Sequence, residues 1–222
     1  MSNDQNASVK KGRGRPKHFD RDDALDKALE LFWRHGYEST SLTDLVEATG
    51  AKAPTLYGEF GNKEGIFRAA AERYISKFAD RGNALLSNPE CSAAEATEDF
   101  LRDTAALFTD KNLPSGCFLI CTSAALSSAS EDVGQMLRDR HRVQEKMLAD
   151  FLRSRQIKGE ISGKADTAAL AKYLTCLMQG MSVQARDGAT HEELDLIVTT
   201  MMSVWPELTR FDNADSPAEL EA

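Results

Sequence analysis

The sequence predicts an all-α fold, and three features of the chain support this prediction. Apolar residues recur with a period near 3.6, the spacing of one helix face, along most of the chain. The alternation of apolar and polar residues that is typical of half-buried strands persists nowhere. Ser, Thr, Asp or Asn precedes several of the periodic segments and Gly follows several of them, as expected where helices begin and end.

The first predicted helix begins after Asp20, an N-cap residue with a second acid at Asp23. Gly36 ends this helix, because glycine adopts the left-handed conformation found at helix C-termini. Between them lies one apolar stripe with i, i+3, i+4, i+7 and i+8 spacing, made of Leu25, Ala28, Leu29, Phe32 and Trp33.

Two short helices are expected next. The earlier one is capped by Thr40 or Ser41, runs to Thr49 and is ended by Gly50. A third helix should begin near Pro54, because proline suits the first helical turn, where its missing N–H has no helical partner to lose. Inward-facing apolar residues in these two helices are Leu42, Leu45, Val46, Leu56 and Phe60.

A fourth helix, capped by Asn62 and running to about Asp80, follows the two short ones. Two short helices joined by a tight turn that contains glycine, resting on a longer amphipathic helix, form a helix-turn-helix. An arbitrary packing of three helices is the alternative that periodicity leaves open. Residues off the apolar stripes favour DNA, because hydroxyl, phenol and ammonium groups bind phosphates and base edges and Glu59 is the only acid between Ala48 and Asn62. These candidates are Thr43, Lys52, Thr55, Tyr57 and Lys63.

Three runs of this region carry a more specific signature: Gly36–Val46, Thr55–Tyr57 and Phe60–Glu64, with Gly50 between the first two. Together they resemble the DNA-binding signature of the TetR/AcrR family of one-component regulators. The resemblance implies an all-helical homodimer, a third helix that enters the major groove and a C-terminal domain that binds an inducer. It places four residues at positions that contact DNA, chiefly phosphates: Thr43, Thr55, Tyr57 and Lys63.

Two positions depart from the family pattern. Lys52 stands where the family usually has a serine that caps the recognition helix. A lysine cannot cap a helix N-terminus and its charge opposes the helix dipole there, so we expect Lys52 to reach a phosphate. The variable pair before Thr55 is Ala53 and Pro54, whose base contacts could only be apolar, for example with a thymine methyl group.

Charge is distributed unevenly along the chain. Residues 1–80 carry equal numbers of basic and acidic residues, so the net charge of −8 belongs to residues 81–222. The N-terminal arm is cationic, and its segment Gly12–Lys17, which includes Arg13 and Arg15, resembles an AT-hook core. Two interpretations remain open for this arm: arginines that lie in a narrow A·T-rich minor groove, or a basic tail that adds non-specific affinity.

Beyond residue 80 the periodicity predicts five more helices. Their expected positions are one from a capping box of Ser92 and Glu95, one over Cys117–Ser128, one from a Ser130 cap to Ile157, one over Ala165–Asp187, and one from a capping box of Thr190 and Glu193 to Val204, closed by Pro206. Inward positions of these helices are the candidate lining of a ligand pocket. They are Phe100, Thr104, Phe108, Cys117, Cys121, Met147, Phe151 and Met178.

The last two helices carry more apolar residues than one partner helix would cover, in Leu177–Val183 and Leu194–Val204. Two such helices from each of two chains would form a four-helix bundle at a two-fold interface, and the family resemblance favours the same helices. Burial of these residues in a monomer core is the alternative.

The i, i+4 pair Cys117 and Cys121 could bind a soft metal or form a redox pair, against the alternative that both thiols act as small buried hydrophobes.

The sequence shows no metalloprotease, hydrolase or nucleotide-binding motif, so we expect no enzyme activity, no cofactor and no metal. The first residues lack the apolar region of a secretory signal and no apolar stretch could span a bilayer, so we expect a cytoplasmic protein without membrane contact.

The full prediction is an all-α protein with an N-terminal helix-turn-helix three-helix domain plus a C-terminal helical ligand-binding and dimerisation domain. Its segments are a disordered basic arm (1–17), a DNA-binding domain (18–64), a ligand-binding and dimerisation domain (65–210) and a disordered acidic tail (211–222). The expected function is transcriptional regulation, with repression favoured over activation, by a homodimer that binds palindromic double-stranded DNA and is released by a small-molecule inducer.

Overall fold

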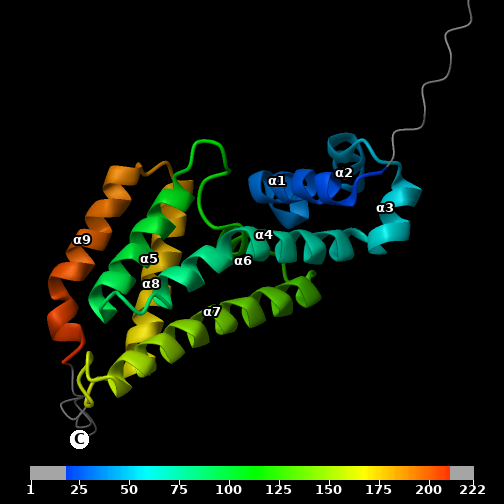
Figure 1. Ribbon diagram of the computed structural model, residues 1–222. Coiled ribbons are helices and arrows are strands. Elements are labelled where there is room, and N and C mark those ends of the chain that lie inside the picture. Colours follow the sequence, from blue (N-terminus) through cyan, green and yellow to red (C-terminus); the bar gives the residue numbers. More distant parts are fainter. Residues whose placement is uncertain (1–18, 211–222) are drawn as a thin grey trace, which may run out of the picture.

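The structure, a computed structural model, describes residues 19–210 apart from the side chains of residues 79 and 80. The basic arm with Arg13 and Arg15, and the acidic tail, lie outside the described residues. Within residues 19–210 there is no strand, so the all-α prediction is confirmed (Figure 1). The helices are α1 (Arg21–Ser39), α2 (Leu42–Thr49), α3 (Ala53–Phe60), α4 (Lys63–Leu86), α5 (Ala93–Phe108), α6 (Phe118–Ala124), α7 (Glu131–Ile157), α8 (Thr167–Arg186) and α9 (His191–Leu208).

The N-terminal helices begin and end where the sequence predicts. The Asp20 side chain accepts hydrogen bonds from the first backbone N–H groups of α1. Gly36 has φ +81° and breaks the regular helix there, although three more residues continue α1 beyond it. Of the two candidate caps of α2, the structure uses Ser41, which forms a capping box with Asp44. Gly50 ends α2 with φ +68°, which only glycine adopts without strain.

Helices α1 to α3 and the first turns of α4 share one core. Phe32 of α1, Leu45 of α2, Leu56 of α3 and Phe67 of α4 are each no more than 1% exposed. An ion-pair network between α1 and α4 adds to this packing, because Arg73 and Lys77 of α4 both reach Asp26 of α1, at 2.9 and 2.6 Å. The Arg73 guanidinium is the main cause that lowers the pKa of Asp26 to about 2.

Helix α4 connects this three-helix head to the rest of the molecule (Figure 1). It starts at the end of α3, packs along α1 and continues to pack on α5 and α7. Helices α5, α8 and α9 pack beside one another, α7 packs along α8, and the short α6 packs against α1, α8 and α7. A displacement of α4 would therefore alter the packing in both the head and the C-terminal half.

Three helix ends beyond residue 80 and one cap differ from the sequence prediction. Helix α6 ends at Ala124 rather than Ser128, and α4 continues to Leu86. Helix α9 runs through Pro206, and its last turn is closed by the Thr209 N–H, which donates to the carbonyl oxygen of Trp205. Ser130 precedes α7 as predicted, but its side chain makes no capping hydrogen bond, because its hydroxyl donates to Glu38 instead.

Candidate DNA-binding face and ligand cavity

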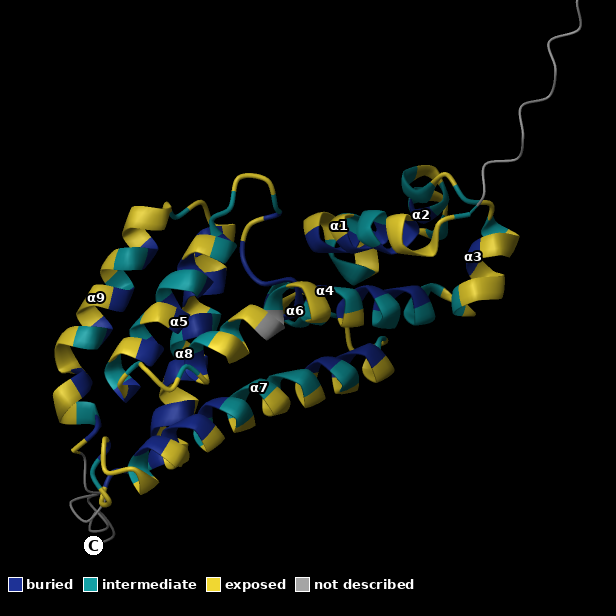
Figure 2. Cartoon of the chain, viewed as in Figure 1, coloured by how far each residue is buried: buried dark blue, intermediate teal, exposed yellow. Residues whose placement is uncertain are grey.

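The two short helices have the geometry of a helix-turn-helix. Two residues separate Gly50 from the first residue of α3, and the side chain of the α3 N-cap residue, Lys52, forms no capping hydrogen bond. Leu56 anchors α3 in the core, whereas Pro54 and Thr55 are exposed and Tyr57 is 44% exposed. Figure 2 shows α3 at one end of the molecule with much of its surface exposed.

Positive charge is not opposed by a free acid on α3. Glu59 pairs with Arg21 of α1 at 2.7 Å, and the Arg21 guanidinium lies 5.3 Å from the centroid of the Phe60 ring. These contacts neutralise the acid and hold the end of α3 against α1. The predicted DNA contacts Thr43, Lys52, Pro54, Thr55 and Tyr57 are all exposed on α2, α3 and the turn between them, and Ala53 is partly exposed beside them.

Lys63 lies differently from the other candidates. Its ammonium group lies 4.3 Å from the centroid of the Tyr37 ring and donates a hydrogen bond of 3.4 Å to the carbonyl oxygen of Glu38. Partial burial lowers the pKa of Lys63 from its usual value, since desolvation disfavours the charged form. The lysine therefore sits at the joint between α1 and α4, beside the α2–α3 unit, with its side chain half-buried.

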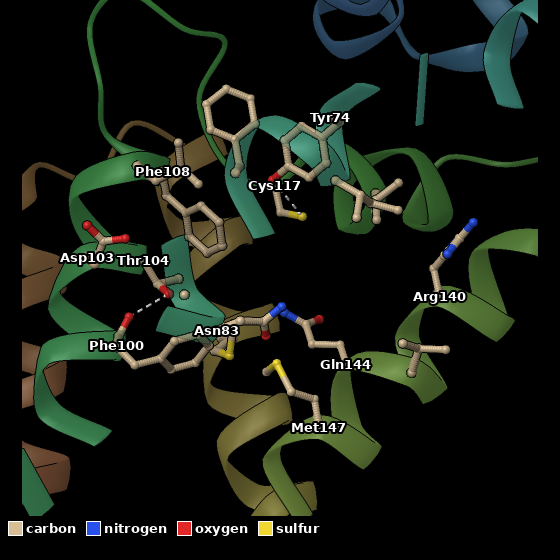
Figure 3. Close-up of a pocket in the computed structure, with 17 residues that line it drawn as sticks. Tyr74, Asn83, Phe100, Asp103, Thr104, Phe108, Cys117, Arg140, Gln144 and Met147 are labelled. Carbon is tan, nitrogen blue, oxygen red and sulfur yellow. Dashed lines mark hydrogen bonds between the residues drawn. The ribbon is translucent and has the colours of Figure 1, made fainter. Parts of the chain in front are cut away.

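A cavity of about 240 Å³ lies in the C-terminal half, between α4, α5, α6, α7 and α8 (Figure 3). Six of the eight residues predicted to line a ligand pocket line it: Phe100, Thr104, Phe108, Cys117, Met147 and Met178. Cys121 and Phe151 lie outside this lining. Cys121 is directed toward Ser182, with 3.6 Å between the sulfur and the hydroxyl oxygen, and Phe151 packs under the Arg155 guanidinium.

Sequence reasoning missed two walls of the cavity. One is the second half of α4, which contributes Tyr74, Ile75, Phe78, Gly82 and Asn83, and the other is the middle of α7, which contributes Arg140, Val143 and Gln144. The signal in α4 was visible as continued apolar periodicity past Tyr74, but periodicity does not distinguish a cavity wall from a packed core. The close approach of α4 to α5 needs a glycine, because a Cβ at Gly82 would lie 2.9 Å from the Phe100 ring.

The charged side chains at the cavity are already paired. Asp103 forms an ion pair with Arg81, and Arg140 forms one with Glu72. Burial raises the pKa of Tyr74 well above its usual value and also raises the pKa of the Cys117 thiol, so both groups are neutral near pH 7. Most of the remaining wall is apolar, and the polar side chains of Asn83 and Gln144 point toward one another from α4 and α7 (Figure 3).

Cys117 connects the cavity to the rest of the fold. The Tyr74 hydroxyl lies 3.4 Å from the Cys117 sulfur, and the Cys117 N–H donates to the Ser182 hydroxyl at 2.8 Å. Among residues 19–210, no group of three or more His, Cys, Asp or Glu side chains could hold a metal ion. The raised pKa of the Cys117 thiol is typical of a buried thiol rather than of a reactive thiolate.

Comparison with known proteins identifies the two halves. The model of bacterial regulatory proteins of the tetR family matches residues 24–70, and that of the tetracyclin repressor-like C-terminal domain matches residues 93–201. The chain belongs to the TetR family. Members of this family are DNA-binding transcriptional regulators and not enzymes, so these two predictions are confirmed.

Individual relatives agree with this assignment. The HTH-type transcriptional repressor ComR of Escherichia coli (strain K12) is 52% identical over 210 residues, which are 95% of this chain and 100% of ComR. A cysteine mutant of the TetR family transcriptional regulator CifR, solved with 26-bp double-strand operator DNA, is 34% identical with a TM-score of 0.82, over 86% of this chain and 100% of CifR. The reduced form of E. coli NemR, 22% identical with a TM-score of 0.71 over 81% of this chain and 93% of NemR, shares the fold. No helix within residues 19–210 is long and apolar enough to cross a bilayer.

Proposed function

We propose that this TetR-family protein is a transcriptional repressor that acts in the cytoplasm and binds a palindromic operator as a homodimer. The observation that carries the proposal is the exposed face of α3, where Lys52, Thr55 and Tyr57 surround a buried anchor, Leu56, and the single acid is paired. The relatives named as repressors and the neighbour solved with operator DNA support it. In this proposal residues 18–64 read DNA and residues 65–210 bind the inducer and dimerise.

Tyr57→Phe and Lys63→Ala should weaken binding to all operators similarly, since phosphate contacts carry no sequence information. Loss of one phenol hydrogen bond should cost about 1 kcal/mol, or roughly fivefold in affinity. Loss of the lysine should reduce the salt dependence of binding by about one unit of slope. Fluorescence polarisation at several salt concentrations measures both. A change in the preferred sequence for Lys63→Ala would contradict the assignment of this residue to the DNA backbone.

Deletion of residues 1–17 should lower DNA affinity and flatten its salt dependence, because five basic residues are removed. The flanks of the operator distinguish the two interpretations of the arm. If Arg13 and Arg15 lie in the minor groove, the loss of affinity should be larger for operators flanked by A·T tracts than for those flanked by G·C. Equal losses on both flanks would leave only the non-specific basic tail.

The proposed dimer uses the outer faces of α8 and α9. Of the seven large hydrophobic residues exposed in residues 19–210, four lie there: Tyr173, Val183, Leu196 and Val204. The exposed Gly180 lies on the same stripe as Tyr173 and Val183, which leaves room for two helices to approach closely. Met178, Met181, Leu194 and Met201 are instead buried within the chain, so only part of the apolar surplus expected from the sequence is available to a partner.

We further propose that the inducer is a neutral, compact and largely apolar molecule with one hydrogen-bonding group. An apolar cavity of about 150 Å³ holds a benzene ring, so a cavity of about 240 Å³ has room for two fused rings. Both charged residues in the lining already have partners, and burial of an unpaired charged ligand would be costly. The carboxamides of Asn83 and Gln144 can each donate and accept a hydrogen bond.

Three probes with one two-ring skeleton test this ligand class: naphthalenemethanol, naphthoate and naphthylmethylammonium. By calorimetry the neutral alcohol should bind about tenfold or more tightly than either ion. Met147→Lys places a cation in the wall and should reverse the preference toward naphthoate, which would locate the binding in this cavity. Tighter binding of naphthoate or the ammonium to the unmodified protein would contradict the proposal.

A further inference from the structure

Two side-chain contacts join the three-helix head to the C-terminal half at points that the core packing does not require. The first involves Glu38, in the short segment of α1 beyond Gly36. One oxygen of its carboxylate accepts hydrogen bonds from the Ser127 N–H at 3.1 Å, the Ser127 hydroxyl at 2.6 Å and the Ser130 hydroxyl at 2.8 Å. Both serines belong to the loop between α6 and α7. Three donors on an anionic oxygen form a strong and directional contact.

The second contact involves Arg186, the last residue of α8. Its two terminal nitrogens donate to the carbonyl oxygens of Trp33, at 2.9 Å, and Arg34, at 2.8 Å. These carbonyls lie just before the break at Gly36, at the end of the regular part of α1, where helix carbonyls lack intrahelical partners. The guanidinium therefore caps α1 from another domain and complements its dipole.

The elements that form both contacts, the loop after α6 and the end of α8, also contact the cavity residue Cys117 or follow it closely in the chain. Phe118 opens α6 directly after the cavity residue Cys117, and its ring lies 6.3 Å from the Trp33 ring and 5.3 Å from the Phe67 ring. The loop that holds Glu38 begins where α6 ends. Arg186 lies one turn after Ser182, which holds the Cys117 N–H. Helices α6 and α8 thus connect the cavity wall to the two contact points.

We infer that Glu38 and Arg186 are positioning residues, which together we call the latch, and that the latch fixes the angle of the three-helix head relative to the C-terminal half. A head held at one angle makes a dimer selective for one separation between half-sites. A head held only by α4 and by the packing of α6 against α1 would accept several separations. In this account the specificity for half-site spacing, which rests on the proposed homodimer, is set by residues far from the bases.

The head angle is measured within a single chain, so this part of the test does not depend on dimerisation or on DNA. Spin labels on unnatural amino acids at the exposed positions 47 and 157 report the distance between α2 and the end of α7. Labelled chains are mixed with excess unlabelled protein, so that one labelled chain is observed at a time. We expect a narrow distance distribution that broadens in Glu38→Ala, in Arg186→Met and in the double variant Ser127→Ala/Ser130→Ala.

Operators chosen by in vitro selection and then altered in spacing by about one or two base pairs test the specificity. Affinity for the selected spacing should fall about tenfold in the latch variants, a typical size for coupling between sites, with little change on the altered spacings. Combining Glu38→Ala with the serine variant should add nothing, because both remove the same contact. Matched controls are Glu30→Ala, whose carboxylate pairs with Arg34 within α1, and Arg153→Met on the exposed face of α7.

Unchanged distance distributions together with unchanged spacing selectivity in folded variants would overturn the inference. Thermal unfolding identifies a variant that merely fails to fold, and the serine variant, which alters only a surface loop, then provides the test. If the unmodified protein selects no DNA sequence, the proposed function fails, whereas the distance measurement still decides whether the latch holds the head. A broad distribution in the unmodified protein would also overturn the inference.

Discussion

Val183→Glu combined with Leu196→Glu should convert the protein to monomers and lower its affinity for a full operator by about 10²-fold or more. The reason is that the second half-site is no longer bound by a head linked to the first one. Both side chains are exposed in the single chain, 44% and 65%, so the substitutions place charge on the surface and leave the core intact. In a dimer the same glutamates would be buried without partners. Sedimentation measures the association and fluorescence polarisation measures the binding.

The choice of residues matters for this experiment. Met181 lies in the helix that we assign to the interface, but it is 1% exposed within one chain, so a charge there would unfold the protein rather than separate two copies. Ile157→Glu is the matched control, because Ile157 is 80% exposed and belongs to α7, outside the helices assigned to the interface. A doubly substituted protein that remains a dimer would contradict the assignment of the interface to α8 and α9. A monomer with undiminished operator affinity would show that DNA recognition does not require the dimer.

Arg155→Ala should destabilise the fold by about 3–5 kcal/mol, the range found when one partner of a buried ion pair is removed. The Arg155 side chain is 4% exposed and donates to the carbonyl oxygens of Cys91, at 2.8 Å, and Asn88, at 2.9 Å. It also pairs with Glu160 at 3.0 Å, whose second oxygen accepts the Ala93 N–H at the start of α5. One guanidinium therefore ties the end of α7 to the connection between α4 and α5.

Urea denaturation of Arg155→Ala and of Arg153→Ala compares this buried arginine with an exposed one two residues away on the same helix. The exposed substitution should change the free energy of unfolding by no more than about 0.5 kcal/mol. Arg155→Lys should fall between the two, because an ammonium keeps the charge but cannot reach both carbonyls with a planar fork. Equal stability of the two alanine variants would show that the buried network contributes nothing net.

The helices and the DNA-binding unit could be predicted from the sequence because their signals are local. Caps at Asp20, Ser41, Asn62, Ser92 and Thr190 act on backbone groups two or three residues away, and the structure uses all five. Ser130 shows the limit of this reasoning, since its hydroxyl donates to a residue 92 positions earlier in the chain. The periodicity of apolar residues does not indicate a hydrogen bond to a partner so distant in sequence.

The cavity could be predicted only in part for the same reason. Residues of α5 and α8 face inward whether they meet a packed core or an empty space, so Phe100 and Met178 were found as inward positions. The contribution of α4 depends on its tilt between the head and the C-terminal half, which no pattern in the sequence encodes. Arg155 continues the inward stripe of Leu148, Phe151 and Leu152, so a charged residue on an apolar stripe was the available signal for the buried network.

The most direct test of the account is the number of chains that bind one selected DNA duplex. In vitro selection with the full chain, followed by analytical sedimentation of the protein on the selected duplex and on its half-site, measures sequence and stoichiometry together. We predict a palindromic sequence, two chains on the full duplex and a loss of affinity of about 10²-fold on the half-site. Selection of no sequence over random DNA, or one chain bound with full affinity to a half-site, would contradict the account.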